Sequence, residues 1–310
     1  MISRRALLRT VLICLAVAAT IYWGSQIFDL ETFAQFRERF NWAGFLPAAF
    51  ISILASYLVR TLRFMVFLRA DVPIRPAALA EVFVASNFLF GFAALTPGQL
   101  GDVLKVEFVH NRFGVKRGTA LKIFVQEKVL DLICVVLLAG IAVQTEGLGT
   151  AVGLNLWLIL VCLGGVALLG GVALYALKRR DIDLRTVFDW RALPVTLFLT
   201  ALFWYLVIWG WQQIWAAHDI SVGVMATGFA VSGSTLISII SFIPGAIGVS
   251  EVSVAGALIL QDIDVEAASI ASLLTRCYML AIIVNGIIFA PGAVWLWWRA
   301  RRMSKQQELI

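Results

Sequence analysis

The chain has 310 residues, of which 61% are hydrophobic and only 14% are charged. Soluble domains typically contain about 45–50% apolar and about 25% charged residues, so this composition excludes a water-soluble enzyme, a nucleic-acid-binding domain and a disordered protein as whole-chain descriptions. The net charge of +6 has to be interpreted by position, because Lys and Arg mark the cytoplasmic side of membrane proteins.

Apolar segments long enough to cross a hydrocarbon core of about 30 Å recur along the chain. The first, at about 6–28, has three arginines at or just before its start and continues well past its small-residue stretch, so we interpret it as an uncleaved signal anchor. The segments lack the strict alternation of barrel strands, which predicts an all-α polytopic membrane protein. Further spans are expected at about 41–68, 119–143, 155–177, 193–215 and 267–297.

Two other apolar stretches are interrupted by the pattern Pro-Gly-x-x-Gly. The stretch at 78–95 runs into this pattern at 97–101, and the stretch at 224–261 contains it at 244–248. Pro and Gly interrupt a helix, and backbone freed at membrane depth must be buried in protein or line a cavity. The alternative interpretation is a pair of Pro-kinked structural helices.

The positive charges are strongly polarised. If the N-terminus is cytoplasmic, only Arg37 and Arg39 of the 25 Lys and Arg residues are external, Lys128 and Arg276 lie within spans, and the rest flank cytoplasmic ends. This polarity requires each broken stretch to enter and leave the membrane on one side. We therefore expect six full spans and two re-entrant hairpins, with both termini cytoplasmic.

The two halves of the chain then have the same order of elements. Residues 1–150 and 151–310 each contain span, span, hairpin and span, with a cytoplasmic-side hairpin at 78–114 and an external-side hairpin at 224–261. The first half starts inside and the second starts outside, so the repeats are inverted within a single membrane domain. Inverted repeats with interrupted helices are typical of transporters.

Several ionisable residues are expected deep in the membrane. Glu127 and Asp131 share one helix face at spacing i, i+4, and Arg276 lies near the middle of the last span. A charge at that depth costs about 2.5–3.5 kcal/mol, so such groups usually face the protein interior and find partners. Comparable places on the returning arms of the two hairpins are held by Asp102, Lys105 and Glu251.

These deep charges have a functional and a structural interpretation. Functionally, Arg276 and Lys105 hold a phosphate near hairpin tips whose helix N-termini attract anions. Glu127, Asp131 and Glu251 then relay protons or exchange partners with Arg276. The alternative is a static network of buried salt bridges that holds the helices together.

Other polar residues in the spans have simpler interpretations. Arg60 and Arg63, near the inner end of the second span, are first interpreted as anchors that snorkel to the surface; alternatively they form an entry site for an anionic head group. Asn87 and Asn285 lie in mid-span and are expected to join packed helices by hydrogen bonds.

Five sequence blocks, in order, resemble those of the flippase-like transmembrane family that includes the membrane region of lysylphosphatidylglycerol synthases. The family usually has Arg after the first proline, then Gly-Glu and a downstream Arg. This chain has Gly98, Gln99, Asp102 and Lys105 at those places and so keeps the charge types of the last two. The blocks are 60–64, 97–105, 127–131, 244–251 and Arg276.

The resemblance implies movement of aminoacylated phospholipids or other polar lipids between leaflets, without lysine transfer itself. The leading hypothesis is a multi-pass lipid flippase of the bacterial inner membrane that acts by alternating access at the repeat interface. The alternative is an intramembrane enzyme or accessory protein of lipid or lipid-linked glycan synthesis, and a scaffold for such enzymes is a third possibility. The residues expected to bind or move the head group are Arg60, Arg63, Pro97, Gly101, Asp102, Lys105, Glu127, Asp131, Pro244, Gly245, Gly248, Glu251 and Arg276.

The expected partners are membrane lipids, anionic or lipid-linked, and lipid-biosynthesis enzymes, but not nucleic acid. No catalytic residues, metal ligands or cofactor are expected. The pattern GxxxxGK[ST] does not occur in the sequence, so ATP hydrolysis would have to come from a partner.

Overall fold

The described part of the chain is helical. No β-strand occurs in it, which agrees with the predicted all-α fold. The predicted signal anchor at 6–28 and the predicted span at 155–177 lie outside it. The computed structural model describes residues 40–71, 78–96, 103–145, 192–241 and 243–307, together with Phe36, Glu38 and Arg75.

The helices begin and end close to the predicted limits. The main difference is the last helix, which continues past the expected end at 297 because the charged and polar residues that follow are good helix formers. In chain order the elements are α3 (Trp42–Asp71), α4 (Ala78–Ala93), α5 (Leu104–Phe113), α6 (Arg117–Thr145), α9 (Leu193–Ala216), α10 (Val224–Ser241), the short helix η3 (Pro244–Ala246), α11 (Val249–Ile259) and α12 (Val265–Gln307).

Three of these helices are long and apolar enough to cross a membrane, judged by length and composition. They are Trp42–Arg69 in α3, Leu193–Ala216 in α9 and Val265–Arg299 in α12. The 29-residue helix α6 is longer than two of these spans, but four charged side chains interrupt its apolar sequence. The described helices are those of a polytopic α-helical membrane protein.

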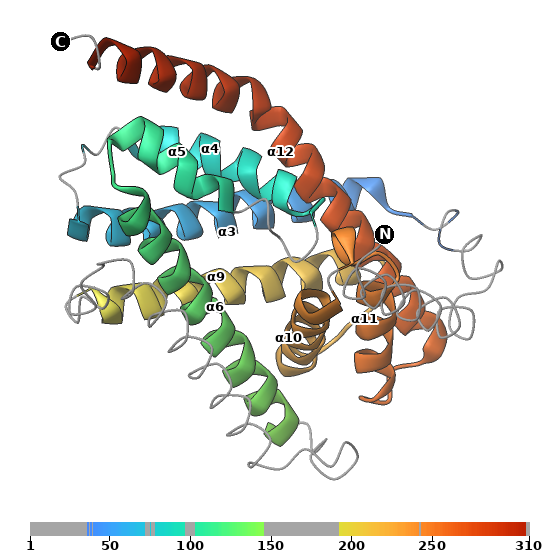
Figure 1. Cartoon of the computed structure of the whole chain (residues 1–310). Helices are drawn as coiled ribbons and strands as arrows, with labels where there is room; N and C mark the ends of the chain where they lie inside the picture. The colour runs from blue at the N-terminus through green and yellow to red at the C-terminus, as the bar shows by residue number, and fades with distance from the viewer. Residues whose placement is uncertain are drawn as a thin grey trace, which may run out of the picture.

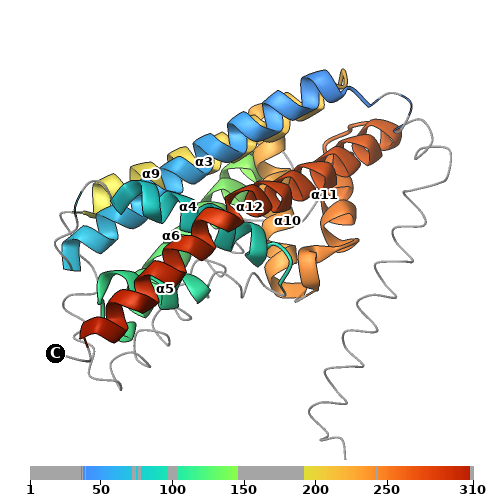
Figure 2. The ribbon, with the colours of Figure 1, turned by 90° about the horizontal axis from the view of Figure 1, so that it is seen from above.

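Helices α3 and α9 lie side by side along most of their length (Figures 1 and 2). Near the start of α3, the Asn41 side chain donates to the carbonyl of Ala217, after the end of α9, at 3.1 Å. Towards the other end, Arg63 donates to Thr200 in the first part of α9 at 2.8 Å. The two helices are therefore antiparallel.

Helix α4 packs along α12 through polar and small residues. Asn285 donates to Asn87 at 2.8 Å, and both side chains are buried, which confirms the prediction that they join packed helices. One turn away, a Cβ built on Gly91 would lie only 2.7 Å from the Cα of Gly286. The two backbones thus approach each other as closely as small residues allow in membrane helix pairs.

The second broken stretch forms a helix–turn–helix. Helices α10 and α11 pack against each other, and Pro244 begins the short η3 segment between them. Gly245, Ala246 and Gly248 all have φ in the left-handed region, at 62°, 48° and 79°. Glycine adopts such angles without steric cost. The residues at two of these three positions, Gly245 and Gly248, therefore fit the backbone of the turn.

The tip of this turn lies beside the end of α4. A Cβ on Gly245 would come within 3.4 Å of the carbonyl oxygen of Ala94, three residues before Pro97. The residues at 97–102, including Pro97, Gly101 and Asp102, lie outside the described part. The chain leading into the first break therefore meets the turn of the second.

Candidate functional site

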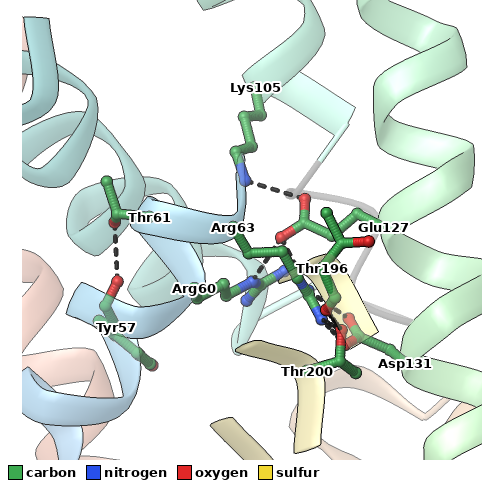
Figure 3. A network of polar contacts seen from close by, with 9 residues as sticks. All are labelled: Tyr57, Arg60, Thr61, Arg63, Lys105, Glu127, Asp131, Thr196 and Thr200. Atoms are coloured by element: carbon green, nitrogen blue, oxygen red, sulfur yellow. Dashed lines mark hydrogen bonds and ion pairs between the residues drawn. The ribbon is translucent and has the colours of Figure 1, made fainter. Parts of the chain in front are cut away.

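A network of charged side chains lies where α3, α5 and α6 converge (Figure 3). Helix α3 contributes Arg60 and Arg63, which are three residues apart and so share a helix face. Helix α6 contributes Glu127 and Asp131 at spacing i, i+4, and the first turn of α5 contributes Lys105. The structure thus brings together five of the residues singled out in the sequence.

Glu127 is the centre of this network. One carboxylate oxygen accepts from Arg60 Nε and from Arg63 Nη2, each at 3.1 Å. The other accepts from Lys105 Nζ at 2.9 Å. The Glu127 side chain is fully buried, so these charge-assisted bonds, about twice as strong as neutral ones, replace the water that the carboxylate has lost.

Arg63 connects the network to α9. Its guanidinium donates to both carboxylate oxygens of Asp131, at 2.6 and 3.1 Å, and to the hydroxyl of Thr200 at 2.8 Å. The Thr200 hydroxyl itself donates to the carbonyl of Thr196 at 2.7 Å. This fork geometry is specific to arginine, because lysine presents a single point charge.

An aromatic ring lies against each of the three cations. The Arg60 guanidinium carbon is 4.2 Å from the centre of the Phe90 ring, and the Lys105 ammonium is 3.8 Å from that of Phe64. Phe203 lies 5.9 Å from the guanidinium carbon of Arg63. Cation–π contacts are worth more when the cation is desolvated, so the rings add to what the carboxylates contribute.

Together the five side chains carry three positive and two negative charges. Taking each ion out of water costs several kcal/mol even after the protein relaxes, and apolar residues of similar size often stabilise a fold as well or better. The network is therefore an expensive way to join three helices. In membrane spans, charges kept at this cost mark substrate or ion pathways.

The second broken stretch has a smaller cluster of its own. Arg276, on α12, donates to the carbonyl of Gly245 at 2.8 Å and pairs with Glu251 on α11, with Nε and Oε1 3.3 Å apart. The backbone of Pro244 and Gly248 lies in the same turn. These four positions and Arg276 complete the predicted site residues that the structure describes.

Comparison with known proteins identifies the family. The family model described as "Lysylphosphatidylglycerol synthase TM region" matches residues 7–286, which is most of the chain. The chain belongs to this family. A search of the curated proteins found no match.

In this member of the lysylphosphatidylglycerol synthase TM family, the interpretation of Arg60 and Arg63 as snorkelling anchors is wrong. Arg60 is only 5% exposed and Arg63 is fully buried, and both bind Glu127, so neither is an anchor that snorkels to the surface. A snorkelling side chain keeps its charged head in water. Here a carboxylate on another helix takes the place of that water.

Lys105 and Arg276, which are expected to hold a phosphate together, bind different carboxylates in the structure. Lys105 binds Glu127, whereas Arg276 binds Glu251, so the two cations belong to separate clusters with separate carboxylates. Each cluster joins the returning arm of one broken stretch to the long helix that follows it.

Some members of the network were not singled out in the sequence. Thr200 had a usable signal, because Thr196 and Thr200 form a polar i, i+4 pair in the otherwise apolar first half of α9. Phe64 ends the block 60–64, but that block does not indicate a contact with Lys105. Phe90 had no signal, because the chain contains 21 Phe residues and nothing local distinguishes those that lie against a cation.

Two further ion pairs fix α5 to its neighbours. Arg112 donates to both carboxylate oxygens of Glu81, on α4, at 2.6 and 2.8 Å. Arg117, at the start of α6, donates to both oxygens of Glu107 at 3.0 and 2.9 Å, and these bonds hold the pKa of Glu107 at about 2. Helix α5, which carries Lys105, is thus tied to both α4 and α6.

Proposed function

We propose that the protein is a lipid transporter that moves an anionic, phosphate-bearing head group between leaflets by alternating access, while the lipid chains stay in the bilayer. The observation that carries this proposal is the buried network around Glu127. Its three cations, two of them arginines with fork geometry, have the chemistry that binds phosphate. The family likewise belongs to lipid-related membrane proteins.

The arrangement of the helices supports two inverted halves. Helices α3 and α9 are the second predicted spans of their halves, and they are antiparallel, as opposite insertion requires. Helix α4 packs on α12 and, correspondingly, α10 packs on α6. The described helix of each proposed hairpin therefore lies against the last helix of the other half, and the end of α4, before the first break, lies beside the turn at Gly245, which is compatible with transporters that have broken helices.

Cysteine labelling tests this topology. We expect single cysteines at Arg75 and Lys116, which flank the first broken stretch, to react from the cytoplasm, and those at Ser221 and Glu266, which flank the second, from outside. All four side chains are exposed, and the native cysteines are replaced first. If the two members of either pair react from opposite sides, that stretch is a full span and the inverted repeat is wrong.

Leaflet transfer in proteoliposomes tests the function. Purified protein is reconstituted with a trace of head-group- or chain-labelled lipid, and the fraction protected from a membrane-impermeant quencher is followed with time. We expect a labelled anionic phospholipid to cross faster than in protein-free vesicles, and a labelled neutral diglyceride to show no protein-dependent change. Transfer equal to protein-free vesicles for every head group would contradict the proposal, and chemical conversion of a lipid would favour an intramembrane enzyme.

We also place the protein in the plasma membrane of a bacterium, with both termini in the cytoplasm. The positively charged segments beside α3, α5 and α12 support this orientation. On this placement Arg112 and Arg117 face the cytoplasm, where α5 is tied to its neighbours. Anionic lipids of the inner leaflet would approach the network from that side.

A further inference from the structure

Arg276 has unusual partners for an arginine on a long apolar helix. One of its guanidinium nitrogens donates to a backbone carbonyl, that of Gly245, at the tip of the turn between α10 and α11. Its Nε lies 3.3 Å from Oε1 of Glu251, which is the nearest contact of the ion pair. This nearest contact is longer than the usual 2.7–2.9 Å of a charge-assisted bond.

This pair is also more open than the network around Glu127. The side chains of Arg276 and Glu251 are 21% and 12% exposed, whereas that of Glu127 is fully buried beneath three cations. Ile247, in the turn itself, is 61% exposed. A ligand can reach the Arg276–Glu251 pair without first dismantling the core.

Both members of the pair keep a partner when they separate. The second oxygen of Glu251 accepts from the hydroxyl of Ser250 at 2.7 Å, and Arg276 still donates to Gly245. A buried group left without any partner costs about 1–3 kcal/mol, and more if it is charged. Because neither group is left without a partner, exchange of Glu251 for another anion is far less costly here than at Glu127.

The two clusters also correspond across the halves with their charges exchanged. In the first half, the returning arm carries the cation Lys105 and the following helix carries the anion Glu127. In the second half, the returning arm carries the anion Glu251 and the following helix carries the cation Arg276. The first half thus encloses its carboxylate in cations, whereas the second presents a guanidinium to one replaceable carboxylate.

We propose that Arg276 is an anion-exchange site, at which the phosphate of a lipid head group displaces Glu251 while Arg276 stays bonded to Gly245. This inference rests on the proposed function, and it adds a second binding site for the head group at the external-side turn between α10 and α11. Glu251 is a built-in competitor that occupies the guanidinium when no lipid is bound. Removing the competitor and removing the receptor must therefore have opposite effects on binding.

Equilibrium binding to the purified full chain tests this directly. An environment-sensitive fluorophore is attached at Ile247→Cys, and short-chain phosphatidylglycerol, inorganic phosphate and a neutral short-chain diglyceride are titrated in uncharged detergent. We expect Glu251→Gln to bind the phospholipid more tightly, by about 3- to 10-fold, and Arg276→Gln to bind it at least about 10-fold more weakly. Arg276→Lys is expected to lie between wild type and Arg276→Gln.

Glu266→Gln, an exposed carboxylate in the first turn of the same helix, is the matched control and should not change binding. Binding that weakens in both Glu251→Gln and Arg276→Gln, or in neither, overturns the proposal. If the neutral diglyceride gives the same response as the phospholipid, the assignment to a lipid phosphate is wrong. If inorganic phosphate gives a response and the phospholipid gives none, that assignment is also wrong. Competition by inorganic phosphate supports recognition of the phosphate group itself.

The outcome is separable from that of the proposed function. Opposite effects of the two variants on binding, without any leaflet transfer, would leave the anion site standing and contradict transport. Leaflet transfer with unchanged binding in both variants would leave transport standing and contradict this site.

Discussion

Glu127→Gln is expected to be the most damaging conservative substitution in the protein, lowering its stability by about 3–5 kcal/mol, which is typical when one partner of a buried ion pair is removed. The amide keeps the shape of the side chain but loses its charge. Of the two carboxylates among these five side chains, only that of Asp131, which binds Arg63, is then left, and the three buried cations repel one another.

Unfolding by SDS titration, followed by circular dichroism, measures this effect. Glu127→Asp keeps the charge and should be less damaging, and Glu266→Gln, an exposed carboxylate outside the network, should unfold like wild type. Adding Arg60→Met to Glu127→Gln should restore part of the lost stability, because it removes one of the three cations that Glu127 binds in the wild type. A Glu127→Gln protein as stable as wild type, with no coupling to Arg60, would show that the network does not depend on its central carboxylate.

Gly91→Val is expected to separate α4 from α12. Even a single Cβ at Gly91 would lie 2.7 Å from the Cα of Gly286 and 3.1 Å from the carbonyl oxygen of Ile282. These are backbone atoms, which cannot rotate away as a side chain can. We expect Gly91→Ala to cost about 1–3 kcal/mol, the usual range for overpacking, and Gly91→Val to cost more.

The matched control for this substitution is Gly256→Ala in α11. A Cβ at Gly256 meets no atom within 4 Å, so the alanine should be neutral or stabilising by up to about 1 kcal/mol, as expected from helix propensity. The same SDS titration compares the two proteins. If Gly91→Ala is as stable as Gly256→Ala, the close approach of α4 and α12 is not a tight constraint.

Much of the fold and part of the site could be predicted from the sequence, because polar and charged groups within a membrane need partners inside the protein. Asn87 and Asn285 are polar groups in apolar helices, so the need for hydrogen-bond partners alone predicts that they lie at helix contacts. Glu127 and Asp131 were recognised for a similar reason, since four residues apart they share one face and a charge at that depth needs a partner.

The partners themselves could not be predicted in the same way. Arg60 and Glu127 are 67 positions apart, and no local pattern states that their helices meet. The arginines were first interpreted as anchors because their place near the inner end of a span fits the surface. Helix α3 continues to Asp71, however, which leaves both arginines more than one turn from its end and within reach of α6.

The second half shows the same limit. Glu251 and Arg276 were both singled out, but their pairing depends on how far the turn at Gly245 brings α11 towards α12. The left-handed backbone of that turn follows from its glycines, whereas the contact with Ala94 follows only from the packing of the whole chain. Local chemistry therefore predicted the charged residues, and tertiary packing determined which of them met.

The central claim, that the buried network moves lipid head groups, is tested most directly by leaflet transfer of labelled anionic phospholipid in matched proteoliposomes. Wild type, Glu127→Gln and Glu266→Gln are compared at equal amounts of folded protein, verified by size-exclusion chromatography and circular dichroism. We predict that Glu266→Gln transfers lipid at the wild-type rate and that Glu127→Gln is at least about 10-fold slower, corresponding to about 1.4 kcal/mol in the barrier. Equal rates for folded Glu127→Gln and wild type would contradict the account and would show that the network only holds the helices together.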